Sequence, residues 1–211
     1  MITTYYMDLE TTGLNAYHNE ITEIAIVRTK EPEKAIMNTL VKTTKPIPHS
    51  VVRLNGISNE LVEKEGISYR DMMDNVIDFL RKNTPEGNAI WFIGHNVIGF
   101  DRVFFENSIR KYNYKHPEDP IEMPDIHWMD TLPMAKYTMP EKDRHRLQSL
   151  VPKEKQRHRA LGDCKMVHSI YRDLIRTTTR NLTRDYPEVM RSCKGKGAHF
   201  LYKTIASLLS M

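Results

Sequence analysis

The N-terminal segment of the chain places two carboxylates on one face of an apolar strand. Residues 2–9 are typical of a buried strand that carries Asp8, and Glu10 follows just before a turn near Gly13. Because strand side chains alternate between two faces, Asp8 and Glu10 point to the same side. Two carboxylates this close repel each other unless a proton or a cation intervenes, and all-oxygen ligands favour Mg²⁺ or Mn²⁺ over Zn²⁺. The segment therefore predicts part of a divalent-metal site.

The composition is that of an ordinary globular protein. The chain has 211 residues, enough for one well-buried core, and its 40% hydrophobic and 27% charged residues disfavour disordered and membrane proteins. No apolar run approaches the roughly 18 residues of a membrane-spanning helix, and no secretory signal is visible. Cys164 and Cys193 are too few for a disulfide framework. We expect a soluble, intracellular protein without a membrane partner, most simply cytoplasmic, with a nuclear location left open.

Strand-like and helix-like segments alternate along the chain and predict an α/β sheet covered by helices. Residues 20–28 and 35–43 continue from the first strand as an antiparallel meander, and residues 89–94 form a further buried strand. Residues 113–125 are predicted to be a surface loop. Helices are predicted near residues 58–60, from 68 to 80, from 100 to 112, from 132 to 137 and from 163 to 174.

Two further acidic residues extend the candidate site. Asp101 follows a polar turn at the start of a predicted helix, where an ordinary N-terminal cap is the alternative role. His158 precedes Asp163 by five residues. Five residues rotate a helix by about 500°, so the two side chains would lie about 140° apart and could not enter one site. We therefore expect His158 on a loop and Asp163 at the start of the next helix.

In order and spacing, these segments resemble the three motifs of the DEDDh (DnaQ-like) 3′–5′ exonucleases. The matching residues are 8–13 (Asp-Leu-Glu-Thr-Thr-Gly), 95–101 (His-Asn through Phe-Asp) and His158 with Asp163. Residues 129–132 and 145–150 resemble the segment between the last two motifs. The sister subfamily would carry a tyrosine where this chain has Arg159. The resemblance spans residues 2–176 and implies a ribonuclease H-like mixed central sheet flanked by helices.

The resemblance also implies roles for individual residues. It implies contacts to the substrate by Thr11, Leu14, Asn96 and Phe100, with Leu14 wedged against the last base. Ordinary packing is the alternative for Leu14 and Phe100. It further implies that four carboxylates hold two divalent ions, Mg²⁺ or Mn²⁺, and that a histidine acts as general base in a two-metal mechanism: Asp8, Glu10, Asp101, Asp163 and His158.

The expected function is a metal-dependent 3′–5′ exonuclease that releases nucleoside 5′-monophosphates, more readily from single-stranded DNA than from RNA. The expected partner is a nucleic acid with a free 3′ end, and the net charge of +4 agrees weakly with a polyanion. The spacing of Asn96 and Asp101, with Gly162 before Asp163, is closest to exonuclease I and three-prime repair exonucleases. An exoribonuclease is one alternative. A silent nucleic-acid-binding scaffold is another, disfavoured because all four carboxylates and His158 are present.

Two features outside the motifs have open interpretations. Residues 177–211 are expected to form a helical extension packed on an exonuclease domain of residues 1–176, in either a monomer or a homodimer. A basic cluster near the third motif could guide phosphates or could be ordinary solvated charge, and it comprises Arg144, His145, Arg146, Lys153, Lys155, Arg157 and Arg159.

Overall fold

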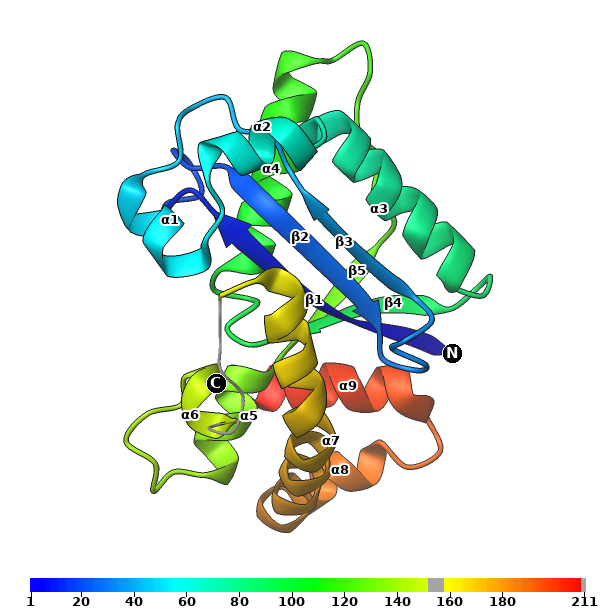
Figure 1. Ribbon diagram of the computed structural model, residues 1–211. Coiled ribbons are helices and arrows are strands. Elements are labelled where there is room, and N and C mark those ends of the chain that lie inside the picture. The colour runs from blue at the N-terminus through cyan, green and yellow to red at the C-terminus, as the bar shows by residue number, and fades with distance from the viewer. Residues whose placement is uncertain (152–157, 210–211) are drawn as a thin grey trace.

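A five-stranded mixed sheet forms the centre of the computed structural model, which describes residues 1–151 and 158–209 (Figure 1). Strands β1 (Ile2–Thr11), β2 (Ile21–Arg28) and β3 (Ile36–Leu40) form the expected antiparallel meander. Strands β4 (Ala89–Gly94) and β5 (Ile126–Asp130) join β1 in parallel, which gives the order β3-β2-β1-β4-β5. The carboxylate-bearing β1 is therefore the central strand, hydrogen-bonded on both sides.

Helices cover both faces of this sheet, as the α/β prediction requires. Figure 1 shows α1 to α4 in the upper half of the molecule and α5 to α9 in the lower half. No helix within residues 1–151 or 158–209 is both long and apolar enough to cross a membrane. The helices are α1 (His49–Asn55), α2 (Asn59–Glu65), α3 (Tyr69–Asn83), α4 (Asp101–Lys115), α5 (Thr131–Thr138), α6 (Leu147–Leu150), α7 (Ala160–Asp185), α8 (Pro187–Ser192) and α9 (Gly197–Leu208).

Alternation along β1 divides the apolar core into two layers. Tyr5 and Met7 lie in the layer that includes the buried side chains of α3 and α4. Tyr6 points the other way, into the layer formed with α5, α7 and α9. Asp8 and Glu10 follow the periodicity of Tyr6, so both carboxylates face the side of the sheet that α7 covers. A side chain on α7 can therefore approach both carboxylates.

Several elements differ from the sequence predictions. Helix α7 starts three residues before Asp163 and runs for 26 residues, so the predicted domain boundary after residue 176 falls inside a continuous helix. Residues 113–115 belong to α4, and Ile121 in the predicted surface loop is 4% exposed. Strand β5 and helices α1 and α6 were not predicted. The β-branched Val51 and Val52 disfavour a helix locally, which is why α1 is hard to see in the sequence.

Helix α9 packs on the sheet layer that contains α7. The Trp91 indole Nε1 donates a hydrogen bond to His199 Nδ1 at 3.0 Å, and the Tyr171 hydroxyl donates to the Tyr202 hydroxyl at 2.7 Å. Ile205 on α9 is fully buried. These contacts join the C-terminal segment to the same core that supports β1 and β4.

Candidate metal centre and adjoining pocket

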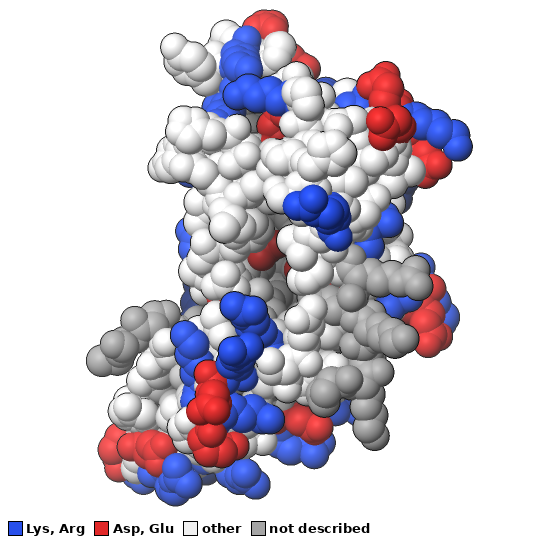
Figure 2. All heavy atoms as spheres, turned by 60° about the vertical axis from the view of Figure 1, so that its left-hand side comes forward, with Lys and Arg blue, Asp and Glu red and all other residues white. Residues whose placement is uncertain are grey.

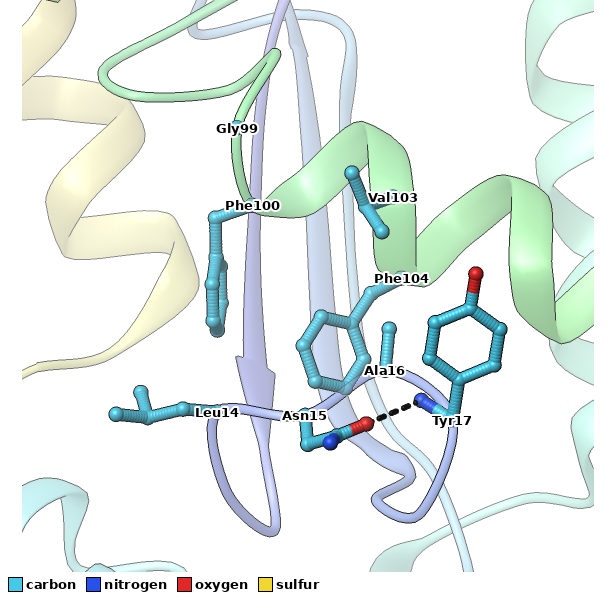
Figure 3. A pocket seen from close by; sticks show the side chains of 8 residues that line it. All are labelled: Leu14, Asn15, Ala16, Tyr17, Gly99, Phe100, Val103 and Phe104. Atoms are coloured by element: carbon cyan, nitrogen blue, oxygen red, sulfur yellow. Dashed lines mark hydrogen bonds between the residues drawn. The ribbon is translucent and has the colours of Figure 1, made fainter.

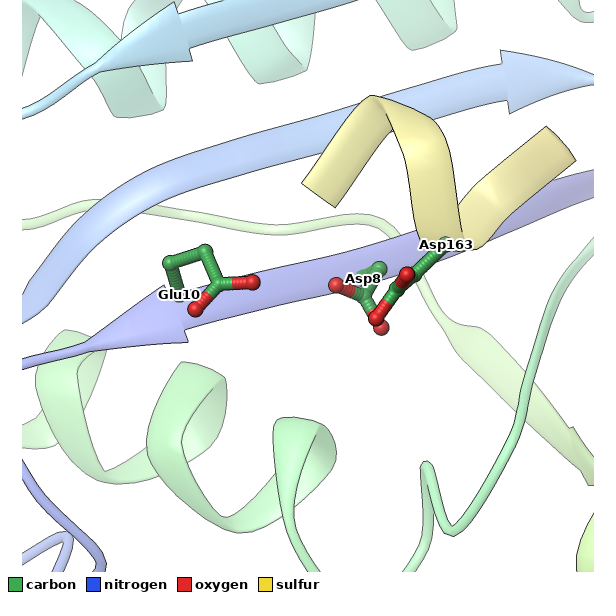
Figure 4. A group of neighbouring side chains, drawn as sticks. All are labelled: Asp8, Glu10 and Asp163. Carbon is green, nitrogen blue, oxygen red and sulfur yellow. The ribbon is translucent and has the colours of Figure 1, made fainter. Parts of the chain in front are cut away.

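Three carboxylates converge on the α7 side of β1. Asp8 and Glu10 come from the strand, and Asp163 comes from the first turn of α7. One carboxylate oxygen of each lies within 4.8 Å of the others, and Figure 4 shows Asp8 and Asp163 side by side with Glu10 nearer the strand end. Figure 2 shows that one face of the molecule is hollowed, with acidic atoms on the floor of the hollow. The geometry therefore brings three of the four expected ligands together.

Asp101 adjoins this cluster without belonging to it. Its Oδ1 accepts a hydrogen bond from the Leu9 backbone N–H at 2.9 Å, which ties the start of α4 to β1 one residue beyond Asp8. The side chain is 4% exposed. Among charged neighbours, Asp101 has the largest effect on the pKa of Asp8, which it raises. The fourth expected ligand thus lies near Asp8, at the start of α4.

The electrostatics of the cluster favour bound protons or cations. Burial, followed by the neighbouring carboxylates, raises the pKa values of Asp8 and Asp101 well above their usual range. Burial also raises the pKa of Glu10 to about 8, although the hydrogen bond from the Asn55 amide opposes the shift. Asp8 and Glu10 are only half-buried and reachable from solvent, whereas Asp163 is 8% exposed. Such a set of oxygen donors fits a hard divalent cation, so the cluster could hold a metal ion.

His158 lies outside the helix, as the rotation argument predicted. It precedes α7 by two residues and has a φ of 44°, a left-handed conformation that is uncommon for a residue with a side chain. Its Nε2 is 3.4 Å from Nε2 of Gln148 on α6. The side chain is half-buried. His158 therefore sits at the junction between α6 and the helix that carries Asp163.

A pocket of 330 Å³ lies between the loop after β1 and the start of α4 (Figure 3). These two segments contain or closely follow, in the sequence, the carboxylates Asp101 and Glu10. The loop after β1 supplies Leu14 and Tyr17, which are 87% and 70% exposed, and the start of α4 supplies Phe100. Ordinary core packing is therefore wrong for Leu14. Phe100 partly packs on the core, with its ring centroid 4.9 Å from that of Phe104. The remaining lining residues are Asn15, Ala16, Gly99, Val103 and Phe104.

The other two expected substrate residues shape the backbone beside the cluster. Thr11 is buried, and its hydroxyl donates to the Gly13 carbonyl at 2.7 Å, which closes the turn after β1. Asn96 has a φ of 65° in the turn between β4 and α4. Its backbone N–H donates to Asp130 Oδ1 at 2.9 Å. The structure therefore shows how both positions are held, while their contact with substrate stays a prediction.

Three residues that hold the site together were not predicted as part of it. Asp130 accepts from three backbone N–H groups, those of residues 96, 98 and 132, and so fixes the turn that leads to Asp101. Asn55 donates its amide to Glu10 Oε2 at 3.0 Å. Glu23 is 1% exposed on β2 and binds Arg159. Only Asp130 carried a local signal, because an Asp between a strand and a helix is a typical N-terminal cap.

The basic cluster and Cys164 both lie near the third motif. Lys153, Lys155 and Arg157 of the basic cluster lie outside the described residues, whereas Arg159 forms a side-chain ion pair. Cys164, next to Asp163, is 1% exposed with its Sγ 3.7 Å from the Ala25 carbonyl oxygen. Burial, and then the nearby carboxylates, raises the pKa of this thiol well above its usual range.

Comparison with known proteins gives a consistent result. The RNase_T family, described as exonuclease, matches residues 6–171. DNA polymerase III of the PolC type from Oceanobacillus iheyensis is 29% identical over 165 residues, which cover 75% of this chain and 10% of that protein. Exonuclease DPD1 of Arabidopsis thaliana, chloroplastic/mitochondrial, is 24% identical over 187 residues, 82% of this chain and 56% of that protein. The chain thus spans about a tenth of the length of the PolC-type polymerase.

Solved structures share the fold at low sequence identity. An Escherichia coli exonuclease I complex with single-stranded DNA matches with a TM-score of 0.63 and 16% identity, over 89% of this chain and 42% of that one. Exonuclease I from Methylocaldum szegediense matches with a TM-score of 0.61 and 17% identity, over 90% of this chain and 42% of that one. The mixed five-stranded sheet with flanking helices is therefore the ribonuclease H-like fold that the motifs implied.

Proposed function

Because the chain belongs to the RNase_T exonuclease family, of the DnaQ-like DEDDh type, we propose that it cleaves the 3′-terminal phosphodiester bond of a nucleic acid. The products are a nucleoside 5′-monophosphate and a strand shortened by one nucleotide. The observation that carries the proposal is the convergence of Asp8, Glu10 and Asp163 within 4.8 Å on one side of the central strand. A scaffold that only binds a polyanion gains nothing from clustered negative charge.

Single-stranded DNA is the proposed substrate. One line of support is the similarity to PolC-type DNA polymerase III, and another is the shared fold with exonuclease I in complex with single-stranded DNA. The pocket beside the cluster is open and partly apolar, which suits an unpaired terminal base that can stack on an aromatic ring. We propose that Leu14 and Phe100 contact this base, while Asn96 and the Thr11 backbone position the terminal sugar.

The acidic residues would hold the cations. Asp8, Glu10 and Asp163 can surround one ion, and Asp101 with Asp8 can serve a second, directly or through water. When bound, two Mg²⁺ or Mn²⁺ ions stabilise the negative charge on the attacking and leaving oxygens of an in-line displacement. The oxygen-only donor set fits these hard cations better than Zn²⁺.

The protein supplies the proton transfer and the alignment. His158 would accept at Nε2 the proton of the attacking water as the water oxygen bonds to phosphorus and the bond to the 3′ oxygen of the preceding nucleotide breaks. The pocket between Leu14 and Phe100 would keep the terminal nucleotide still during this step. Orientation of this kind lowers the activation barrier because the reacting groups have already lost their translational and rotational freedom on binding.

A product ladder tests the proposal directly. Matched DNA and RNA oligonucleotides, labelled at the 5′ or the 3′ end, are incubated with Mg²⁺, Mn²⁺, Ca²⁺ or EDTA. We expect stepwise shortening from the 3′ end with Mg²⁺ or Mn²⁺, faster on DNA, no cleavage in EDTA, and poor turnover with Ca²⁺ because its larger shell is less ordered. Full cleavage in EDTA, or release from the 5′ end, would contradict the mechanism. Faster cleavage of RNA would favour an exoribonuclease.

A further inference from the structure

An ion pair between the half-buried Arg159 and the buried Glu23 joins the second strand to the beginning of α7. Glu23 is 1% exposed and accepts three hydrogen bonds: from Arg159 Nε at 2.9 Å, from Arg159 Nη2 at 2.6 Å and from the Ala160 backbone N–H at 3.0 Å. The guanidinium thus binds the carboxylate through two of its nitrogens, the geometry that gives strong and directional pairing.

The position of this pair connects it to the candidate centre. In the β1–β2 register Glu23 lies opposite Glu10, and both face α7. Arg159 directly follows His158, and Ala160 begins the helix whose first turn carries Asp163. The pair therefore fastens the segment that carries both residues of the third motif to β2, the strand paired with the one that carries the first motif.

Arg159 also belongs to a basic stretch, where it could instead bind substrate phosphates. Its Nε and Nη2 edge, one of the two edges with which a guanidinium binds a phosphate or a carboxylate through two nitrogens, is already occupied by Glu23. If Arg159 left, Glu23 would remain as a buried carboxylate without its counter-charge, which is unfavourable. The left-handed φ of 44° at His158 also requires neighbouring contacts to hold it, and the pair supplies them one residue later.

We propose that Arg159 is a positioning residue that acts through Glu23 to hold His158 and Asp163 in place, and that it does not contact the substrate. The inference rests on the proposed nuclease function, because it assigns the pair a role in turnover. It also predicts how substitutions in the pair change cation affinity in the absence of nucleic acid. Arg159→Gln leaves a negative charge beside Glu10, whereas Glu23→Gln leaves a positive one.

Four variants test this role: Glu23→Gln, Arg159→Gln, Arg159→Lys and the double Glu23→Gln/Arg159→Gln. Arg81→Gln is the matched control, because Arg81 pairs with Asp78 at 3.0 Å on the exposed side of α3. The readouts are kcat, oligonucleotide affinity by fluorescence anisotropy in Ca²⁺, Mn²⁺ affinity by calorimetry without nucleic acid, and thermal unfolding. Arg159→Lys keeps the charge without the two-nitrogen geometry, so it remains informative if Arg159→Gln does not fold.

We expect kcat to fall about 10- to 100-fold in each single variant, the range for residues that orient a metal site from outside. The double variant should lose no more than the worse single one, since the two residues act as a unit. Oligonucleotide affinity should stay within about twofold of wild type, given that no phosphate contact is removed. Mn²⁺ should bind more weakly to Glu23→Gln than to Arg159→Gln, because the first variant leaves a positive charge beside Glu10 and the second a negative one, whereas simple loosening of the fold would weaken both equally.

Three outcomes would overturn the inference. If Arg159→Gln loses oligonucleotide affinity while kcat stays normal, Arg159 is a phosphate contact. If kcat in all the variants matches that of Arg81→Gln, the pair is purely structural. If the losses in kcat add in the double variant, the residues act separately. An inactive wild-type protein would instead contradict the proposed function, and the Mn²⁺ measurements would still decide whether the pair acts on the metal site.

Discussion

Hydrogen bonds restrict Glu10 and Asp101 before any cation arrives. Asn55 holds Glu10, and the Leu9 backbone holds Asp101. Asp8 on β1 and Asp163 on α7 lie side by side (Figure 4). Because the scaffold fixes these side chains, removing a charge should affect catalysis much more than folding.

Asp8→Asn and Asp163→Asn should each lower kcat/KM by about a thousandfold or more, since an amide keeps the shape but loses the charge that holds the cations. Steady-state cleavage of a labelled oligonucleotide measures the loss, and circular dichroism checks the fold. Asp173→Asn is the control, because Asp173 is exposed on the same helix. A loss below about tenfold would show that the ligands are misassigned.

His158→Ala should lower single-turnover cleavage by roughly 10²- to 10⁴-fold, the range for removal of a positioned acid or base. Affinity for the oligonucleotide in Ca²⁺ should hardly change, because the imidazole moves a proton and does not anchor the strand. His116→Ala, an exposed histidine just after α4, serves as control. Weak binding with normal cleavage of bound substrate would make His158 a phosphate contact.

How far individual residues could be predicted depended on how local their signals are. Asp8 and Glu10 were predictable as a pair because strand alternation alone puts them on one face. Glu23 looked like an ordinary strand residue, since its partner Arg159 lies 136 positions away. Asn55 is likewise 45 positions from Glu10. Such contacts depend on the tertiary fold, and no periodicity in one segment encodes them.

Among the elements, the loop after β1 and the start of α4 form the pocket together. Asn107 Nδ2 on α4 donates to the Ala16 carbonyl at 2.6 Å, and Lys111 Nζ donates to the same oxygen at 2.8 Å. These bonds hold the loop that carries Leu14 and Tyr17 against α4. The pocket is therefore a feature of two clamped elements and not of one motif.

Phe100→Ala should raise KM about 5- to 150-fold, because stacking of a base on an aromatic ring contributes about 1–3 kcal/mol. The turnover of saturated enzyme should change less. Steady-state kinetics on a single-stranded oligonucleotide separates the two effects, with Tyr114→Ala on the same helix as control since Tyr114 is 89% exposed. An unchanged KM would place the terminal base outside this pocket.

The strength of local patterning also decided which elements were predictable. The β1–β3 meander and α3 have clear apolar periods, and Ser68 caps α3 as expected. Strand β5 is only five residues long and follows a proline-containing segment, so it looked like the end of a loop. Its parallel pairing with β4 creates the strand, and that pairing is not visible in the sequence.

For the molecule as a whole, the contacts of α9 imply that the C-terminal segment and the sheet unfold together. Ile205→Ala should lower the free energy of unfolding by about 2–4 kcal/mol, the cost of emptying a buried site. Urea denaturation followed by fluorescence and by circular dichroism should still show one shared transition. Two separate transitions would show that residues 177–211 form an independent unit.

The pH dependence of stability without metal reflects the whole acidic centre. The pKa values of Asp8, Asp101 and Glu10 are raised in the folded protein, that of Glu10 to about 8. A raised folded-state pKa means that stability is full while the carboxyl groups are protonated and is lost as they ionise. In EDTA the melting temperature should therefore fall between about pH 5 and pH 9.

Excess Mg²⁺ or Mn²⁺ should restore the melting temperature, most strongly at the alkaline end, where the carboxylates are free to bind. Differential scanning calorimetry with and without EDTA measures both effects. Glu10→Gln should flatten the dependence because one of the titrating groups is gone. A melting temperature in EDTA that rises steadily from pH 5 to about pH 9 would contradict the raised pKa values.

The burial of Cys164 gives the chain a built-in chemical reporter. Its thiol lies beside Asp163 and against β2, and its raised pKa leaves almost no thiolate at neutral pH. Alkylating reagents and mild oxidants act on the thiolate, so in the folded protein they should pass this residue by. Modification of Cys164 then requires α7 to separate from β2. The rate of modification therefore measures how often the candidate centre opens locally.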